Sequence, residues 1–186
     1  NYFGKKITYG QFFNKVEQIS RSLLSLGVRP GDVVTICMPN TPESVISFYA
    51  TNNIGAVANM VHPLSAPEEI KRYLNESKSR VLIMIDMAYT KVKDIIDSTL
   101  VHKIVVVSAK DSMPKLLRLG YQITKGYKIK KPKLSDRSYI RWSEFALRSI
   151  NYNKSIVHNM KSEDVALILH SGGTTGVPKG ILLSNY

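Results

Sequence analysis

The chain has a single cysteine, Cys37, among its 186 residues, so no disulfide can form within it. A lone thiol in an apolar run is typical of a small buried hydrophobe rather than a nucleophile, and the lack of disulfides indicates a reducing compartment. No uninterrupted apolar stretch approaches the roughly 20 residues that a helix needs to span a bilayer. The sequence begins with Asn1 rather than methionine and shows no signal-peptide pattern, so we expect it to lie within a longer, cytoplasmic protein.

Acidic residues are also scarce, because 14 Asp and Glu stand against 26 Lys and Arg and leave a formal net charge of +12. The excess is concentrated in residues 110–141, where Asp111 and Asp136 are the only acids. The basic residues of this segment are Lys110, Lys115, Arg118, Lys125, Lys128, Lys130, Lys131, Lys133, Arg137 and Arg141. The simpler interpretation is a solvated insertion. The alternative is a patch that attracts nucleic acid, an acidic protein partner or phospholipid, the last as a peripheral contact with the anionic inner face of a membrane. No nucleic-acid partner is expected.

Apolar periodicity predicts helices and strands that alternate along the chain. The predicted helices span residues 9–26, 42–53, 66–77, 88–98 and 142–150, and the predicted strands span residues 33–38, 56–61, 81–85, 103–107, 164–170 and 180–184. Thr8 with Gln11, and Ser65 with Glu68, fit the capping-box pattern, while Thr41 is an N-cap before a first-turn proline. This alternation predicts the α/β class, with a mostly parallel sheet flanked by helices on both faces.

Residues 113–133 break this alternation. They combine a leucine-rich apolar side with basic flanks, and we expect a surface excursion that is partly helical.

The feature with the clearest chemistry is residues 171–180, which follow the predicted strand 164–170 directly. Glycine permits positive backbone dihedrals and close approach of N–H groups to a ligand, and consecutive N–H groups form a concave anion site. Hydroxyl donors and a lysine charge complete a set that suits a polyphosphate. The candidate cofactor-binding residues are Ser171, Gly172, Gly173, Thr174, Thr175, Gly176 and Lys179.

Two better-known phosphate loops do not match this stretch. A Walker loop requires Gly-Lys-Ser/Thr, but Pro178 precedes Lys179 and Gly180 follows it. The dinucleotide fingerprint fails because Ser171 stands two positions before Gly173. An ordinary glycine-rich β-turn remains the alternative.

The order of residues 171–180 resembles the adenylate-forming superfamily, which includes acyl-CoA synthetases, peptide-synthetase adenylation domains and luciferases. The loop of that family reads Thr-Ser-Gly-Ser/Thr-Thr-Gly-x-Pro-Lys-Gly, so Ser171 replaces a usual threonine and Gly172 a usual serine. Other segments that resemble family landmarks are residues 7–9, 27–34, 39–43, 55–57 and 63–70. The resemblance implies that residues 1–186 are the N-terminal portion of the AMP-binding domain, an incomplete part of the large N-terminal domain.

The same resemblance implies an acid–thiol ligase, in which ATP with Mg²⁺ activates a carboxylic acid as its acyl-adenylate and coenzyme A then accepts the acyl group. In that family the loop holds the β- and γ-phosphates, which implies direct contacts from Thr174, Thr175 and Lys179 and a shaping role for Gly173 and Gly176. The leucine-rich and basic segment is most similar to fatty-acyl-CoA ligases, which implies a medium- or long-chain fatty acid. Two alternatives stay open: an enzyme that loads an amino or aryl acid onto a carrier protein, and a non-catalytic basic module that binds membranes or nucleic acid.

The family's adenine-binding segment, acid pocket and catalytic lysine lie downstream of these motifs. We therefore assign no catalytic residue here and expect the 186 residues alone to be inactive. His170 occupies the family's usually aromatic position, where packing or a place at the substrate's edge is expected. His62, before Pro63, is expected to be structural, and neither histidine has ligand-type neighbours at the spacing of a transition-metal site.

Overall fold

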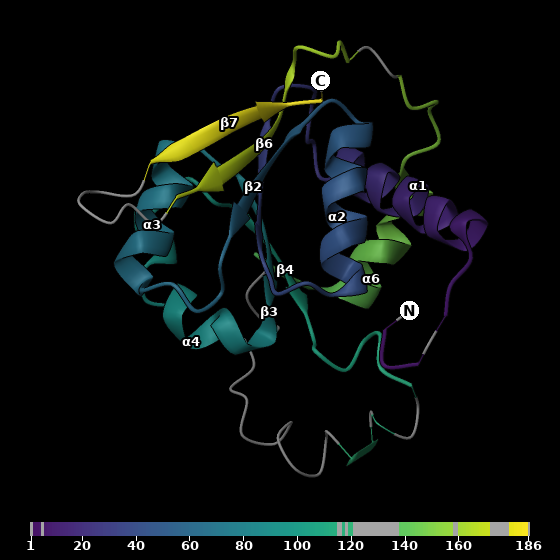
Figure 1. The fold of residues 1–186 in the computed structure, drawn as a ribbon, viewed down its shortest axis with the longest axis horizontal. Coiled ribbons are helices and arrows are strands. Elements are labelled where there is room, and N and C mark those ends of the chain that lie inside the picture. Colours follow the sequence, from purple (N-terminus) through teal and green to yellow (C-terminus); the bar gives the residue numbers. More distant parts are fainter. Residues whose placement is uncertain are drawn as a thin grey trace.

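A computed structural model of the chain describes residues 2–4, 6–114, 117, 119–120, 138–157, 160–171 and 179–185. The described residues form a seven-stranded sheet in the order β5-β4-β3-β1-β2-β6-β7 (Figure 1). All neighbouring strands are parallel except β6 and β7, which form an antiparallel hairpin. The strands are β1 (Val33–Cys37), β2 (Val57–Val61), β3 (Val81–Ile85), β4 (Lys103–Val107), β5 (Tyr139–Arg141), β6 (Val165–His170) and β7 (Gly180–Ser184).

Helices cover both faces of this sheet, which confirms the predicted fold class. The helices are α1 (Tyr9–Ser25), α2 (Pro42–Asn53), α3 (Pro67–Glu76), α4 (Tyr89–Val92) and α6 (Trp142–Leu147). In Figure 1, α3 and α4 lie on one side of the sheet, and α1, α2 and α6 lie on the other. Within the described part of the chain, no helix has the length and apolar character needed to cross a membrane.

The first two predicted helix starts are confirmed in detail. The Thr8 hydroxyl accepts the Gln11 N–H at 3.2 Å, and the Gln11 side chain accepts the Thr8 N–H at 3.0 Å. The Thr41 hydroxyl accepts the Ser44 N–H at 3.3 Å in the same way. These bonds satisfy backbone donors that have no partner within the first helical turn.

The third predicted cap was wrong by one residue. Ala66, not Ser65, is the N-cap of α3, and its N–H donates to the Glu69 carboxylate at 3.0 Å. Pro67 explains the shift, since a proline at the first helical position keeps the preceding residue extended.

The helix predicted for residues 88–98 was wrong in its continuity. The structure has a 3₁₀ turn at Asp86–Ala88, the short helix α4, and a second 3₁₀ turn at Ile96–Ser98. At the end of this segment, the hydroxyls of Ser98 and Thr99 donate to backbone carbonyls three residues back, at 2.6 and 2.8 Å, and so favour the second 3₁₀ turn over an α-helical one.

The short strand β5 was missed in the sequence, because three residues carry too little periodicity to detect. Most of the predicted excursion at residues 113–133, and much of the basic segment 110–141, lie outside the described residues. The predicted membrane contact of that segment therefore stays a prediction.

The core lies between the sheet and its two helical layers. β3 is buried at every position, and β1 at every position after its first. Phe145 of α6 is fully buried on one side, and Ile70 and Leu74 of α3 are fully buried on the other. Strands buried on both faces read as continuous apolar runs, which explains why they were predicted correctly.

A glycine pair tests the turn between α2 and β2. Gly55 has φ +75°, and a Cβ there would lie 3.1 Å from the Pro30 Cβ, whereas Gly10 in α1 has open space around it. We expect Gly55→Ala to lower the free energy of unfolding by about 1–3 kcal/mol, because alanine disfavours a left-handed backbone and meets Pro30. Gly10→Ala is the control and should match or exceed the wild type in urea denaturation. Equal stability of the two variants would contradict the assignment.

Cys37 offers a second test. The side chain has no exposed surface, and burial raises the pKa of its thiol to about 12. Almost no thiolate forms at neutral pH, so we expect a disulfide reagent to label Cys37 no faster than the protein unfolds. Urea-unfolded protein should label at once, and rapid labelling of the folded protein would show that the site opens locally.

Candidate functional site

The β6–β7 hairpin carries the predicted phosphate loop. His170, the last residue of β6, pairs with Gly180, the first residue of β7. Just beyond that pair, the Ser171 N–H donates to the Lys179 carbonyl at 3.1 Å, and the Ser171 hydroxyl donates to the same oxygen at 3.4 Å. The two ends of the segment 172–178 are therefore hydrogen-bonded to each other.

The structure places two of the predicted site residues. Ser171 and Lys179 are described and lie together at the hairpin end. Those outside the described residues are Gly172, Gly173, Thr174, Thr175 and Gly176. Their roles stay predictions.

The position of the hairpin end agrees with ligand binding. β1, β2 and β6 are mutually parallel, so the segments that follow them leave the same edge of the sheet. Ligands in open α/β sheets bind at the carboxyl ends of the strands. Ser171 follows β6 at that edge.

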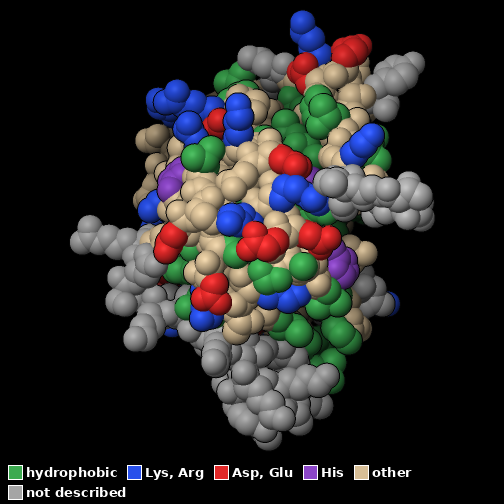
Figure 2. Space-filling view, turned by 90° about the vertical axis from the view of Figure 1, so that its left-hand side faces the viewer, with side chains coloured by type: hydrophobic (Ala, Val, Ile, Leu, Met, Phe, Trp, Pro, Cys, Tyr) green, Lys and Arg blue, Asp and Glu red, His purple; other side chains and the backbone are tan. Residues whose placement is uncertain are grey.

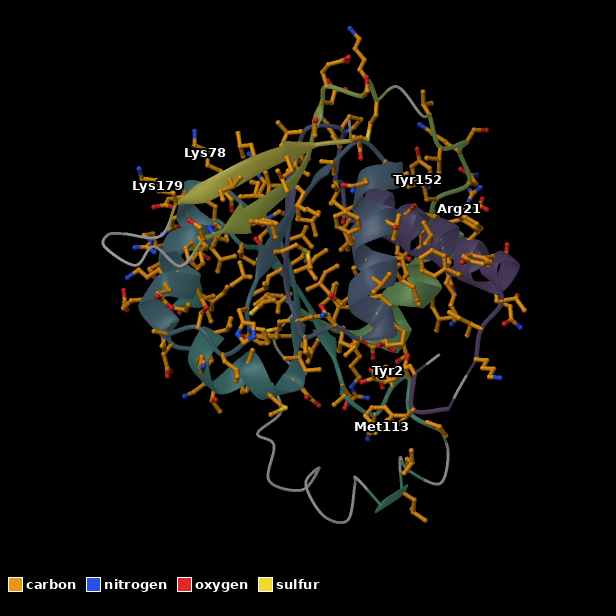
Figure 3. The ribbon with its side chains drawn as sticks, in the orientation of Figure 1. Tyr2, Arg21, Lys78, Met113, Tyr152 and Lys179 are labelled. Carbon is orange, nitrogen blue, oxygen red and sulfur yellow. The ribbon has the colours of Figure 1, made fainter. Side chains whose placement is uncertain are left out.

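Lys179 is the clearest cationic group of the site. Its side chain is exposed at the hairpin end (Figure 3) and forms no ion pair with a carboxylate of the described residues. By contrast, Lys71 and Arg72 of α3 lie 3.6 and 3.8 Å from Glu68 and Glu76. Figure 2 shows the side of the molecule that carries α3 and α4, where basic and acidic side chains are interspersed. Lys179 is thus available to an anionic ligand.

His170 is anchored immediately before the loop. Its ring stacks on Tyr73 of α3 with centroids 3.7 Å apart, and its Nε2 lies 2.7 Å from Oδ1 of Asn59 in β2. Burial lowers the pKa of His170 below its ordinary value of 6.5. The expected packing role agrees with these contacts. Asn59 was not predicted as a site residue, although a polar residue inside the apolar run 56–61 was a usable signal.

His62 has a structural contact, since its Nδ1 accepts the Leu64 N–H at 3.3 Å within the turn after β2. The described ranges contain no cluster of three or more His, Cys, Asp or Glu side chains placed to hold a metal ion.

A separate cavity of about 320 Å³ lies between the N-terminal segment, α1, α2 and α6. Its wall includes Tyr2, Trp142 and the buried Glu43, which accepts a hydrogen bond from Ser112. Figure 3 shows Tyr2 on the opposite side of the molecule from Lys179. Since neither Ser171 nor Lys179 lines this cavity, we place the candidate site at the hairpin.

The chain is similar in sequence to known CoA ligases and synthetases. The chain is 26% identical to a long-chain-fatty-acid–CoA ligase of Bacillus subtilis, covering 100% of this chain and 33% of the relative. It is 32% identical to an acetyl-coenzyme A synthetase of Shewanella sp. (strain MR-4), covering 96% of this chain and 26% of the relative. The chain thus spans about a third or less of these relatives.

Two solved structures share the fold. An anthranilate CoA ligase in complex with anthranoyl-AMP superimposes with a TM-score of 0.76 at 24% identity, covering 97% of this chain and 30% of that one. A long-chain-fatty-acid-CoA ligase of Archaeoglobus fulgidus superimposes with a TM-score of 0.70 at 23% identity, covering 98% and 31%. The model of one family, described as AMP-binding enzyme, matches residues 1–186 from end to end. The chain belongs to the AMP-binding enzyme family.

Proposed function

We propose that the full-length protein containing this chain is an acid–thiol ligase that uses ATP to activate a carboxylic acid as acyl-adenylate and passes the acyl group to coenzyme A. The observation that carries the proposal is the loop sequence 171–180, which leaves the carboxyl edge of a parallel sheet between the hydrogen-bonded Ser171 and Lys179. The two relatives described above, a CoA ligase and a coenzyme A synthetase, support the same reaction class.

The loop would act on the phosphates of ATP. A carboxylate is a poor acyl donor because its oxygen is a poor leaving group, and joining it to the α-phosphate supplies a better one. Pyrophosphate departs as that bond forms, so its charge must be stabilised. Lys179 offers a full charge for this purpose, with hydroxyls from Ser171, Thr174 and Thr175.

The glycines of the loop would let backbone N–H groups approach the same oxygens. These are Gly172, Gly173 and Gly176. Mg²⁺ would share the phosphate charge when it is bound with the nucleotide. Among the described site residues, Lys179 fits a polyphosphate because it presents an exposed ammonium group that has no carboxylate partner in the described part of the chain.

The acid we propose first is a medium- or long-chain fatty acid. This rests on the Bacillus subtilis relative, which matches the whole of this chain. The nearest alternative is an amino or aryl acid loaded onto a carrier protein. Because an anthranilate CoA ligase shares this fold, aryl acids stay among the candidate substrates.

Lys179→Ala tests the loop. We expect the dissociation constant of ATP to rise about 10- to 100-fold, the effect of removing a charge-assisted hydrogen bond to phosphate. Lys161→Ala removes another exposed lysine from the same part of the chain and should leave ATP binding unchanged. Isothermal titration of the full-length protein measures both, and equal affinities in the two variants would remove Lys179 from the site.

ATP–pyrophosphate exchange tests the reaction. With the full-length protein we expect exchange to depend on added acid and to be fastest with medium- or long-chain fatty acids, while acetate and anthranilate serve as competitors. Exchange that is fastest with anthranilate would favour the aryl alternative, and no exchange with any acid would contradict the proposed function. We also infer that the 186-residue piece alone gives no exchange.

A further inference from the structure

One side chain joins the phosphate-loop hairpin to two other parts of the fold. His170 ends β6, opposite Gly180 of β7, and directly precedes Ser171. Its ring stacks on Tyr73 of α3 at an interplanar angle of 20°, and its Nε2 lies 2.7 Å from Oδ1 of Asn59 in β2. The root of the hairpin is therefore connected through His170 to the sheet interior and to the helix that covers it.

The hydrogen bonds around Asn59 fix which way its amide points. The Ser77 hydroxyl uses its single proton to donate to the Leu74 carbonyl at 3.3 Å, so it can only accept from Nδ2 of Asn59, at 3.1 Å. The same Nδ2 donates to the Thr35 hydroxyl at 2.9 Å. With its nitrogen committed to two hydroxyls, Asn59 can offer His170 only an oxygen.

The amide orientation in turn fixes the tautomer of His170. Because Asn59 Oδ1 is an acceptor, Nε2 of His170 carries the proton, and the lone pair of the neutral ring lies on Nδ1. Nδ1 is buried and has no hydrogen-bond partner among the described residues. A Cβ added at Gly180 would lie 3.8 Å from Cε1 and 3.9 Å from Nδ1 of this ring, so this edge of the ring lies beside Gly180.

Protonation would therefore place a charged N–H in a buried position without a described acceptor. Burial is the main reason that the pKa of His170 is lowered; Glu76 of α3 acts in the opposite direction, and Arg72 of α3 lowers the pKa further. The other groups that face the ring are uncharged: Tyr73 of α3, the Asn59 amide of β2 and the Gly180 backbone of β7. Lys179 adds a positive charge next to Gly180 in the sequence.

We propose that neutral His170 is a positioning residue that fixes the root of the phosphate loop on the sheet, and that protonating it weakens ATP binding. The inference rests on the proposed function, because it concerns the same loop. His170 acts through Ser171 and Lys179, to which it is joined by the chain and by the strand pairing, and need not touch the nucleotide. A charged ring gains stability in water, so protonation favours a state in which the Asn59 bond and the Tyr73 stack are lost.

The sign of the pH effect follows from the lowered pKa. The folded protein holds the His170 proton less tightly than the unfolded chain does, so folding releases protons at mildly acidic pH. At pH values above 6.5, the ordinary pKa of histidine, His170 does not change the free energy of unfolding. As the pH falls below 6.5, the free energy of unfolding declines.

The first experiment uses no nucleotide, so it does not depend on the proposed function. Thermal unfolding of the full-length protein is followed from about pH 8 to about pH 5. His170→Gln keeps an N–H donor within reach of Asn59 but cannot titrate, and His102→Gln removes an exposed histidine as a control. We expect the wild type and His102→Gln to lose the same thermal stability as the pH falls. His170→Gln should lose less, because the part of the loss that comes from protonating His170 is absent. A His170→Gln curve parallel to the wild type overturns the inference.

The second experiment measures the dissociation constant of ATP at the two ends of this pH range. The titration of ATP itself affects every variant equally, so it cancels from the ratio of variant to wild type. We compare the ratio of the dissociation constant of His170→Gln to that of the wild type. We expect this ratio to be smaller at acidic pH than at neutral pH, because only the wild type loses affinity when His170 is protonated. His170→Phe keeps a ring on Tyr73 but leaves Asn59 Oδ1 unsatisfied, and we expect an affinity loss on the order of tenfold at neutral pH.

The outcomes separate this inference from the proposed function. If Lys179→Ala weakens ATP binding while His170→Phe and His170→Gln both match the wild type at every pH, the loop binds ATP and the role of His170 is wrong. If Lys179→Ala has no effect, the proposed function of the loop is wrong, whatever the unfolding curves show. If His170→Phe does not fold, the pH series with His170→Gln still decides the question.

Discussion

Burial of the central strands on both faces is the constraint on which the rest of the structure depends. β1 and β3 have almost no exposed residue, so each face of the sheet needs a helical cover, and helices between successive strands supply it. A helix between two strands makes those strands parallel, and parallel strands end at the same edge. The edge where Ser171 leaves β6 is therefore a consequence of core packing, and the chemistry is added to it by the sequence of a single segment.

The polar groups buried among these strands depend on the same register. Thr35 and Asn59 are paired across β1 and β2, and both are fully buried. A buried amide destabilises the fold unless its donors and acceptor are all satisfied, and here Thr35, Ser77 and His170 satisfy them from three different elements. A shift of one residue in the pairing of β2 would move Asn59 to the other face and break all three bonds. The network thus makes the pairing of β1, β2 and β6 specific as well as stable.

Helices and strands could be predicted from the sequence wherever the local signals were strong. Thr8 and Thr41 marked their helices because N-cap chemistry is local, and the strands β1, β3 and β4 appeared as apolar runs because both of their faces are buried. Prediction failed where a distant contact or a competing hydrogen bond determines the local structure. Ser98 and Thr99 favour a 3₁₀ turn at the end of a segment whose apolar spacing looked continuously helical, and β5 exists only because β4 is beside it. For the site, the composition of the loop was enough to predict phosphate binding. The contacts of His170 could not be predicted, because they come from residues 97 and 111 positions away and leave no local pattern.

Within these 186 residues, the outer strand of the hairpin that carries the loop contributes little burial to hold it in place. β7 is exposed along its whole length, including the apolar residues Ile181, Leu182 and Leu183, and no described helix covers it. Its partner β6 is only partly buried, with Ala166 as its one fully enclosed residue. Among the contacts that this chain itself supplies, hydrophobic burial therefore contributes less here than in β1 or β3, and directional contacts fix the hairpin end to the sheet. The stack on Tyr73 and the bond to Asn59 are the contacts that act at that end, and both belong to His170. A site whose backbone donors must meet phosphate oxygens at hydrogen-bond distance depends on such an anchor, because small displacements of its root move every donor in the loop.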